Sequence, residues 1–216
     1  MGASAPRIAV VDYGAGNLRS VAKALVRSGL EPDVTGDGAA VRSADGVVLP
    51  GVGAFADAAR SLREKGLDDA VRHAIEAGRP YLGLCLGLQV LFEEADEHGV
   101  TAGLGLMPGR VERFPDRGPS GERLRVPHIG WNTVRFSGDH PMLASLPEED
   151  IYYFVHSYRP VPSRPEFTVG TADYGGGFTA AAASGSMFAV QFHPEKSQSA
   201  GKRMLDAYAA WVETVR

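Results

Sequence analysis

The single cysteine of this 216-residue chain, Cys85, lies in a pattern that can make a thiol reactive. Gly83 and Gly87 stand two residues to either side, where the apolar run 80–84 is expected to turn from a strand into a helix. Such a turn presents its central side chain at the apex, as in a nucleophile elbow, and the glycines avoid a clash where backbones come close. The helix N-terminus favours thiolate over thiol, and the Leu86 N–H is placed to bind an oxyanion. A lone cysteine is more often a packed core residue, but the glycine spacing favours a catalytic nucleophile.

A thiolate nucleophile needs a base, and His193 is the best candidate among the six histidines. Pro194 and Glu195 follow it directly. On extended backbone, side chains two residues apart point to one face, and Pro194 suits a strand end because it has no N–H to donate. A carboxylate beside an imidazole fixes its tautomer and stabilises the imidazolium. The sequence therefore predicts a Cys-His-Glu triad, with a solvated surface turn as the alternative for this segment taken alone.

Two glycine-rich segments follow predicted strands. Pro50-Gly51-Val52-Gly53 could present backbone N–H groups to developing negative charge, although a plain strand-to-helix connection has the same composition. Residues 12–17 (DYGAGN) carry Gly-x-Gly after the first strand, but Arg19 stands where a dinucleotide-binding loop has its third glycine. We therefore exclude an NAD site there and leave a phosphate or partner contact open.

Two other histidines, His128 and His156, lie in the aromatic segments 127–132 (PHIGWN) and 153–158 (YFVHSY). Both could bind a metal ion, but the chain has no second cysteine and no close histidine pair in its sequence. We interpret both as structural histidines and predict no metal ion and no cofactor.

The composition limits the classes of partner and the compartment. A formal net charge of −4, from 22 Lys plus Arg and 26 Asp plus Glu, argues against a nucleic-acid backbone as the main partner. One cysteine allows no intramolecular disulfide, and no apolar run is long enough to span a bilayer. Residues 1–6 lack the pattern of a secretory signal. We expect a cytoplasmic protein.

The elements that must position these residues differ between the two halves of the chain. In the first half, apolar runs alternate with helical patterns, which predicts a parallel sheet covered on both faces; the runs are 8–11, 47–49 and 80–84, and the helical patterns are 18–26, a stretch from 55, and 86–97. In the second half, turn-forming residues separate the apolar runs, which predicts further strands, partly antiparallel; these runs are 152–158, 167–172 and 187–192, with a closing helix at 200–215. No linker or repeat divides the chain, so we predict one α/β domain over residues 1–216.

With Cys85, His193 and Glu195 in this order, the chain resembles the class I glutamine amidotransferases, which use a Cys-His-Glu triad. Four segments resemble one family within this class, the glutaminase subunits of imidazole glycerol phosphate synthase: 12–17, 49–55, 127–132 and 153–158. The resemblance runs from about Ile8 to the C-terminus without large gaps. It implies the single-domain fold of this class and hydrolysis of glutamine to glutamate and ammonia through a cysteine thioester.

The resemblance also implies a heterodimer in histidine biosynthesis. The partner would be a (β/α)₈-barrel cyclase subunit that receives ammonia through a shielded tunnel, and the ligand of the barrel would switch glutaminase activity on. By motif position, the residues expected to bind substrate glutamine are Gly53, Gln89, Glu97, Ser157 and Tyr158. Those expected toward the partner are Asn17, His128 and Trp131. An amidotransferase subunit of another pathway and a non-catalytic binding module are the alternatives.

The same resemblance assigns the oxyanion to the N–H groups of Val52 and Leu86. A peptide rearrangement is expected before the Val52 N–H faces the oxyanion, and Gly51 and Gly53 reduce the steric barrier to it. The chain departs from some relatives at residues 183–186 (ASGS), where a lysine that faces the partner is replaced by residues without basic side chains.

Overall fold

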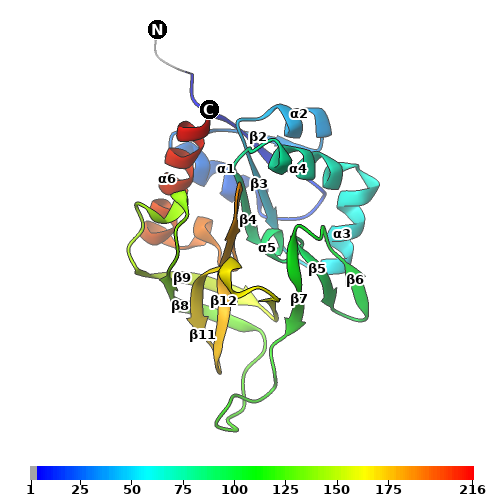
Figure 1. Ribbon diagram of the computed structural model, residues 1–216, viewed down its shortest axis with the longest axis vertical. Helices are drawn as coiled ribbons and strands as arrows, with labels where there is room; N and C mark the ends of the chain where they lie inside the picture. Colours follow the sequence, from blue (N-terminus) through cyan, green and yellow to red (C-terminus); the bar gives the residue numbers. More distant parts are fainter. Residues whose placement is uncertain (1–3) are drawn as a thin grey trace.

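The computed structural model describes residues 4–216 and consists of a central nine-stranded sheet, flanking helices and a smaller four-stranded sheet (Figure 1). Residues 1–3, part of the segment where no secretory signal is expected, lie outside the described residues. The first half of the chain contains the elements β1 (Arg7–Val11), α1 (Leu18–Arg27), β2 (Glu31–Thr35), α2 (Gly38–Ser43), β3 (Gly46–Gly51), α3 (Phe55–Glu64), α4 (Leu67–Glu76), β4 (Tyr81–Cys85) and α5 (Leu86–Gln89).

The parallel half of the large sheet contains the three strands that the sequence predicts and one more, β2, which it does not. Strands β1 to β4 pair in parallel in the order β2-β1-β3-β4. Successive residues of a strand point to opposite faces, so Ile8 and Val10 join the core under α1 and the C-terminal helix, whereas Ala9 and Val11 join the core under α2, α3 and α4. Strands β1, β3 and β4 are therefore apolar on both faces, and helices cover both, whereas the edge strand β2 is polar and mostly exposed.

The rest of the large sheet is mainly antiparallel, again as predicted. Its elements are β8 (His128–Phe136), β9 (Glu149–His156), β11 (Thr168–Asp173), β12 (Gly177–Ser184), β13 (Met187–Val190) and α6 (Gln198–Val215). The order continues from β4 through β13, β12, β11 and β8 to β9, and only β13 is parallel to its neighbour β4. This one parallel pairing joins the two halves of the chain.

The predicted helix over residues 86–97 is wrong beyond its first turn. Helix α5 ends at Gln89, and the chain continues into the second sheet, which has the order β10-β7-β5-β6. Its strands are β5 (Phe92–Asp96), β6 (Val100–Ala102), β7 (Met107–Arg113) and β10 (Tyr158–Pro162). The apolar spacing suits either a helix or a strand, and pairing of Phe92 with Met107 across the sheet decides for the strand.

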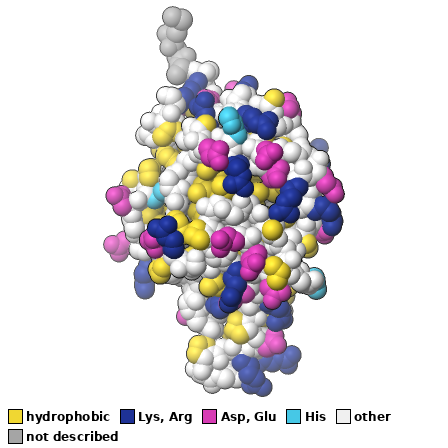
Figure 2. Space-filling view, turned by 45° about the vertical axis from the view of Figure 1, so that its right-hand side comes forward, with side chains coloured by type: hydrophobic (Ala, Val, Ile, Leu, Met, Phe, Trp, Pro, Cys, Tyr) yellow, Lys and Arg dark blue, Asp and Glu magenta, His cyan; other side chains and the backbone are white. Residues whose placement is uncertain are grey.

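Among the described residues there are also three short 3₁₀ helices, at Pro141–Leu143, Pro165–Phe167 and Pro194–Lys196 (η3). The segment between β7 and β8 protrudes from the molecule at the lower end of Figure 1. Acidic and basic side chains are interspersed over the face shown in Figure 2, in keeping with the small net charge. Within the described part of the chain, no helix is long and apolar enough to cross a membrane.

Candidate active site

Cys85 lies at the predicted elbow, where the last residue of β4 meets α5. Its φ of 55° and ψ of −103° fall in a strained region for a residue with a Cβ, and such strain concentrates at functional sites. A Cβ at Gly83 would lie 2.5 Å from the Gly87 carbonyl oxygen, and a Cβ at Gly87 would overlap the carbonyl of Leu49. Both glycines are therefore required by close backbone approach, which fixes the position of the cysteine.

The parallel pairing of β13 with β4 brings His193 to this elbow. Val190 pairs with Leu84, so both strands end at the same edge of the sheet. The His193 N–H donates to the Tyr153 carbonyl at 2.9 Å, and the Ser197 hydroxyl donates to the His193 carbonyl at 2.7 Å. These bonds hold the backbone on both sides of the imidazole.

His193 and Glu195 meet as predicted, although by a different backbone path. His193 is extended, but Glu195 lies in the 3₁₀ helix η3 rather than at a strand end. The His193 Nδ1 and a Glu195 carboxylate oxygen are 2.8 Å apart, and the two side chains are only 4% and 2% exposed. A carboxylate can only accept a hydrogen bond, so Nδ1 carries the hydrogen. The other ring nitrogen, Nε2, is therefore available to exchange a proton with the Cys85 thiol.

The electrostatics of this pair favour the imidazolium. Burial lowers the pKa of His193, but interaction with Cys85 and Glu195 more than offsets it and raises the pKa from 6.5 to about 9. The Nε2 atom has no hydrogen-bond partner among the described residues, so we attribute the effect of Cys85 to charge rather than to a formed hydrogen bond. The site can hold a thiolate–imidazolium pair.

One cavity of about 470 Å³ opens onto Cys85. This volume is in the range of small-molecule sites. Its lining brings together both predicted oxyanion residues and all five predicted substrate residues; the lining residues are Val52, Gly53, Cys85, Leu86, Gln89, Glu97, Pro127, Val155, His156, Ser157, Tyr158 and Lys196. Segments far apart in the sequence therefore converge on the cysteine.

Polar residues that line the cavity are held in place by hydrogen bonds to the surrounding protein. The Gln89 side-chain amide donates to the Tyr158 carbonyl at 3.1 Å and to Gln191 Oε1 at 3.0 Å. Gln191 in turn lies 3.5 Å from Cys85 Sγ and is fully buried. Sequence reasoning did not single out Gln191, although its position two residues before His193 was a usable signal. The Glu97 carboxylate accepts from the Phe55 N–H at 2.6 Å, at the start of α3.

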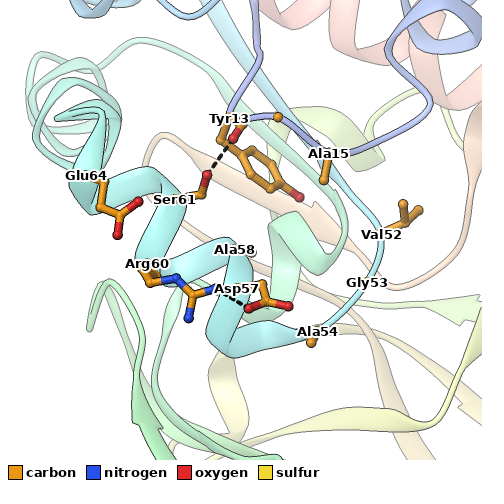
Figure 3. Close-up of a pocket in the computed structure, with 11 residues that line it drawn as sticks. Tyr13, Ala15, Val52, Gly53, Ala54, Asp57, Ala58, Arg60, Ser61 and Glu64 are labelled. Carbon is orange, nitrogen blue, oxygen red and sulfur yellow. Dashed lines mark hydrogen bonds and ion pairs between the residues drawn. The ribbon is translucent and has the colours of Figure 1, made fainter.

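The loop that carries Val52 separates this cavity from a second one of about 350 Å³, shown in Figure 3. Val52 is 42% exposed, and Val52 and Gly53 line both cavities. Gly53 has a φ of 101°, which residues with a Cβ rarely adopt. A Cβ at Gly51 would lie 2.5 Å from the Tyr13 hydroxyl and 2.7 Å from Leu86 Cβ. The two glycines are therefore needed for different reasons, conformation at Gly53 and space at Gly51.

Of the residues expected toward the partner, Asn17 is exposed and Trp131 is 50% exposed. Trp131 packs edge-to-face against Tyr153, with ring centroids 5.9 Å apart. His128, in contrast, is only 3% exposed, so its ring is buried and not free for direct contact with a partner. Strand alternation explains the difference, because His128 and Trp131 are an odd number of residues apart.

His128 and His156 do form a close pair, which their separation in sequence had concealed. His128 Nδ1 lies 3.0 Å from His156 Nε2, and His156 Nδ1 lies 2.8 Å from the Tyr158 carbonyl oxygen. The carbonyl accepts, so His156 carries its hydrogen on Nδ1 and accepts at Nε2 from His128. Burial lowers the pKa of His128 to about 4 and that of His156 to about 3. Both rings are therefore neutral.

Residues 183–186, where the chain lacks the lysine of some relatives, lie away from the cavity. Residues 183–184 end β12 and residues 185–186 form the turn into β13, and the Ser186 carbonyl accepts from the Tyr81 N–H at the start of β4. The turn is therefore at the opposite edge of the sheet from Cys85. The basic residue that does line the cavity is Lys196, for which the sequence predicted no role.

Comparison with known proteins identifies the family. The model of the family described as "Glutamine amidotransferase class-I" matches residues 9–209. A relative from Methylococcus capsulatus named "Imidazole glycerol phosphate synthase subunit HisH" is 49% identical, over 94% of this chain and 96% of the relative. A relative of the same name from Moorella thermoacetica is 47% identical, over 95% of each chain.

Solved structures support the fold. PurLQS from Thermotoga maritima superimposes with a TM-score of 0.73 at 21% identity, over 96% of this chain and 99% of that one. The glutaminase domain of CTPS from Trypanosoma brucei gives a TM-score of 0.63 at 18% identity, over 97% of this chain and 94% of that one. With the family model covering most of its length, this chain belongs to the class I glutamine amidotransferase family.

Proposed function

We propose that the chain is the glutaminase subunit of imidazole glycerol phosphate synthase, a heterodimer with a (β/α)₈-barrel cyclase subunit in histidine biosynthesis. The observation that carries the pathway is the 49% and 47% identity to relatives of that name over nearly the whole chain. The cavity beside Cys85 supports the reaction, since its lining contains the residues expected to bind glutamine. Because catalysis requires a reduced thiol, we expect the enzyme in the cytoplasm.

In the proposed mechanism, the Cys85 thiolate attacks the side-chain amide carbon of glutamine. The N–H groups of Val52 and Leu86 bind the oxyanion. The His193 imidazolium gives its proton to the amide nitrogen, and ammonia leaves as the γ-glutamyl thioester forms. Water activated by neutral His193 then hydrolyses the thioester, which regenerates the thiolate–imidazolium pair and releases glutamate. Glu195 holds the imidazole throughout.

Substrate binding follows from the charges of glutamine, which carries an α-ammonium and an α-carboxylate. Glu97 supplies a half-buried carboxylate for the ammonium. Gln89 lies deeper, 6% exposed, beside Gln191 and the thiol, which suits contact with the reacting end of the side chain. Gly53, Ser157 and Tyr158 complete the binding surface.

We further propose that the exposed residues Asn17 and Trp131 belong to the surface on which the partner docks, and that ammonia passes to the partner through a shielded tunnel. An exposed tryptophan packed against a tyrosine is a typical anchor of a protein interface. His128 would support this surface only through its neighbours, because its own ring is buried.

The test is glutamate release from glutamine by this chain, alone and then with the cyclase and its nucleotide ligand. We expect strong stimulation in the loaded complex, and Cys85→Ala should abolish glutamate release while synthesis from added ammonium survives. Equal activity with and without the loaded partner would refute gating by the ligand. Glutaminase activity without binding to the cyclase would point to an amidotransferase of another pathway. No glutamate release in the presence of an active cyclase would point to a non-catalytic binding module.

A further inference from the structure

The hydroxyl of Tyr13 is a buried polar group in the active-site region that the mechanism above does not use. Tyr13 is 3% exposed, and its hydroxyl has no hydrogen-bond partner within residues 4–216. A buried hydroxyl without a partner costs free energy, because it loses its hydrogen bonds to water without replacement. Its position therefore requires an explanation.

The hydroxyl lies against the peptide that joins Gly51 to Val52. A Cβ added to Gly51 would be 2.5 Å from it. The Ser61 hydroxyl donates to the Tyr13 carbonyl at 2.6 Å, which ties the tyrosine backbone to α3. In Figure 3 the ring extends from this anchored backbone toward the loop that carries Val52 and Gly53. The backbone of Tyr13 is thus anchored to α3, and its hydroxyl contacts the loop at Gly51.

The Val52 N–H lies near this phenol oxygen but makes no hydrogen bond of normal geometry with it. Burial is the main cause that raises the pKa of Tyr13, followed by the charge of Cys85, and the Val52 N–H acts in the opposite direction. A nearby amide N–H lowers the pKa of a phenol because it stabilises the phenolate. The hydroxyl is therefore near both the thiolate and the N–H that must serve the oxyanion.

A planar trans peptide carries its N–H and C=O on opposite sides. When the Gly51–Val52 peptide turns so that its N–H faces the oxyanion, its carbonyl turns toward the hydroxyl. A hydroxyl can accept in the first orientation and donate in the second. We infer that Tyr13 is a positioning residue for the oxyanion loop, and that its hydroxyl donates to the Gly51 carbonyl when the Val52 N–H serves the oxyanion.

The two orientations do not depend on the hydroxyl equally. In the orientation seen here, the hydroxyl lacks a hydrogen bond of normal geometry, so little is lost on its removal. In the turned orientation, a formed hydrogen bond would be lost. Tyr13→Phe should therefore disfavour the turned peptide and lower the kcat for glutamine hydrolysis roughly 3- to 10-fold. The KM for glutamine should not change, because the residues that bind the substrate are untouched.

The experiment compares Tyr13→Phe with the wild type in the complex loaded with the cyclase and its nucleotide ligand. Tyr152→Phe is the matched control, because Tyr152 also has a buried hydroxyl without a partner among the described residues, near Asp150 and Arg203 instead. Three quantities are measured: kcat and KM, the rate of Cys85 alkylation by iodoacetamide, and the affinity for glutamate γ-semialdehyde, which forms an oxyanion on the thiol. Thermal unfolding shows that the variants are folded.

We expect lower kcat and weaker semialdehyde binding by the same factor in Tyr13→Phe, with alkylation, KM and the control unchanged. Alkylation needs the thiolate but no oxyanion donors, so an equal fall in alkylation would mean that the hydroxyl acts on Cys85, and the inference would be wrong. Unchanged kcat, or a change in KM alone, would also overturn it. The inference rests on the proposed role of Val52; a wild-type complex without glutaminase activity would refute that function instead.

Discussion

Replacing Glu195 with Gln tests the proposed triad, because the contact between Glu195 and His193 lets us work out how far the pKa of His193 should change. The carboxylate contacts His193 Nδ1 at 2.8 Å, and both side chains are almost fully buried. A hydrogen bond to a charged group contributes about 1.5–3 kcal/mol. One pKa unit corresponds to about 1.36 kcal/mol, so the substitution should lower the pKa of His193 by roughly one to two units.

The consequence is a shift in the alkaline limb of the pH profile. His193 must be protonated to give its proton to the leaving ammonia. The kcat/KM of the wild type should therefore fall as pH rises through about 9, the pKa of His193. In Glu195→Gln this limb should move down to a pH of roughly 7–8. The plateau should also fall, by about 100-fold or more, because an amide can donate to Nδ1 and select the wrong tautomer.

The assay is glutamate release by the loaded complex between pH 5.5 and 10, a range we choose to bracket both limbs. Glu213→Gln, at an exposed position near the end of α6, removes the same charge away from the site and should leave the profile unchanged. An alkaline limb that stays near 9 in Glu195→Gln would show that the carboxylate does not set the protonation of His193.

Three further outcomes follow from the structure. Gly51→Ala should lower glutamate release at least roughly tenfold, because the new methyl group meets Tyr13 and Leu86; equal rates would remove the oxyanion loop from the mechanism. Stability should fall in acid, because the neutral pair His128 and His156 has a folded pKa of about 4 and about 3 against 6.5 when unfolded. The unfolded state then binds more protons below pH 6.5, and urea midpoints should drop from pH 7 to pH 4.5; a flat response would contradict the depressed pKa values. Trp131→Ala should weaken binding of the cyclase by about tenfold or more in calorimetry, without loss of folding; unchanged affinity would move the interface elsewhere.

The parts of the site that could be predicted are those defined by local sequence. Gly83 and Gly87 flank Cys85 so closely that five consecutive residues, 83–87, are enough to predict the elbow. His193 and Glu195 are likewise two residues apart, so their contact survives the difference between a strand end and a 3₁₀ turn. Local spacing constrains such contacts whatever the tertiary structure does.

The parts that could not be predicted depend on long-range pairing. Gln191 lies beside Cys85 only because β13 and β4 pair in parallel, across 106 residues of sequence. The contact of Tyr13 with Gly51 likewise joins segments that only the sheet brings together. In the same way, pairing of β5 with β7 overrides an apolar spacing that also fits a helix. Periodicity reports which face of an element is buried, but not which element covers it.

The distribution of restraints around the cavity indicates where regulation can act. Cys85 is held by backbone contacts at Gly83 and Gly87, and His193 by bonds to Tyr153 and Ser197, so moving either would break packing in the core. Val52 is less restrained: it is 42% exposed, follows the last residue of β3 and precedes a glycine at positive φ, and its N–H makes no hydrogen bond of normal geometry within residues 4–216. Beyond it, Glu97 ties the start of α3 to the cavity, and Tyr13 ties the same helix to the loop. A partner that displaces this face can therefore change the oxyanion donor without disturbing the triad, which is why we place ligand control in the loop.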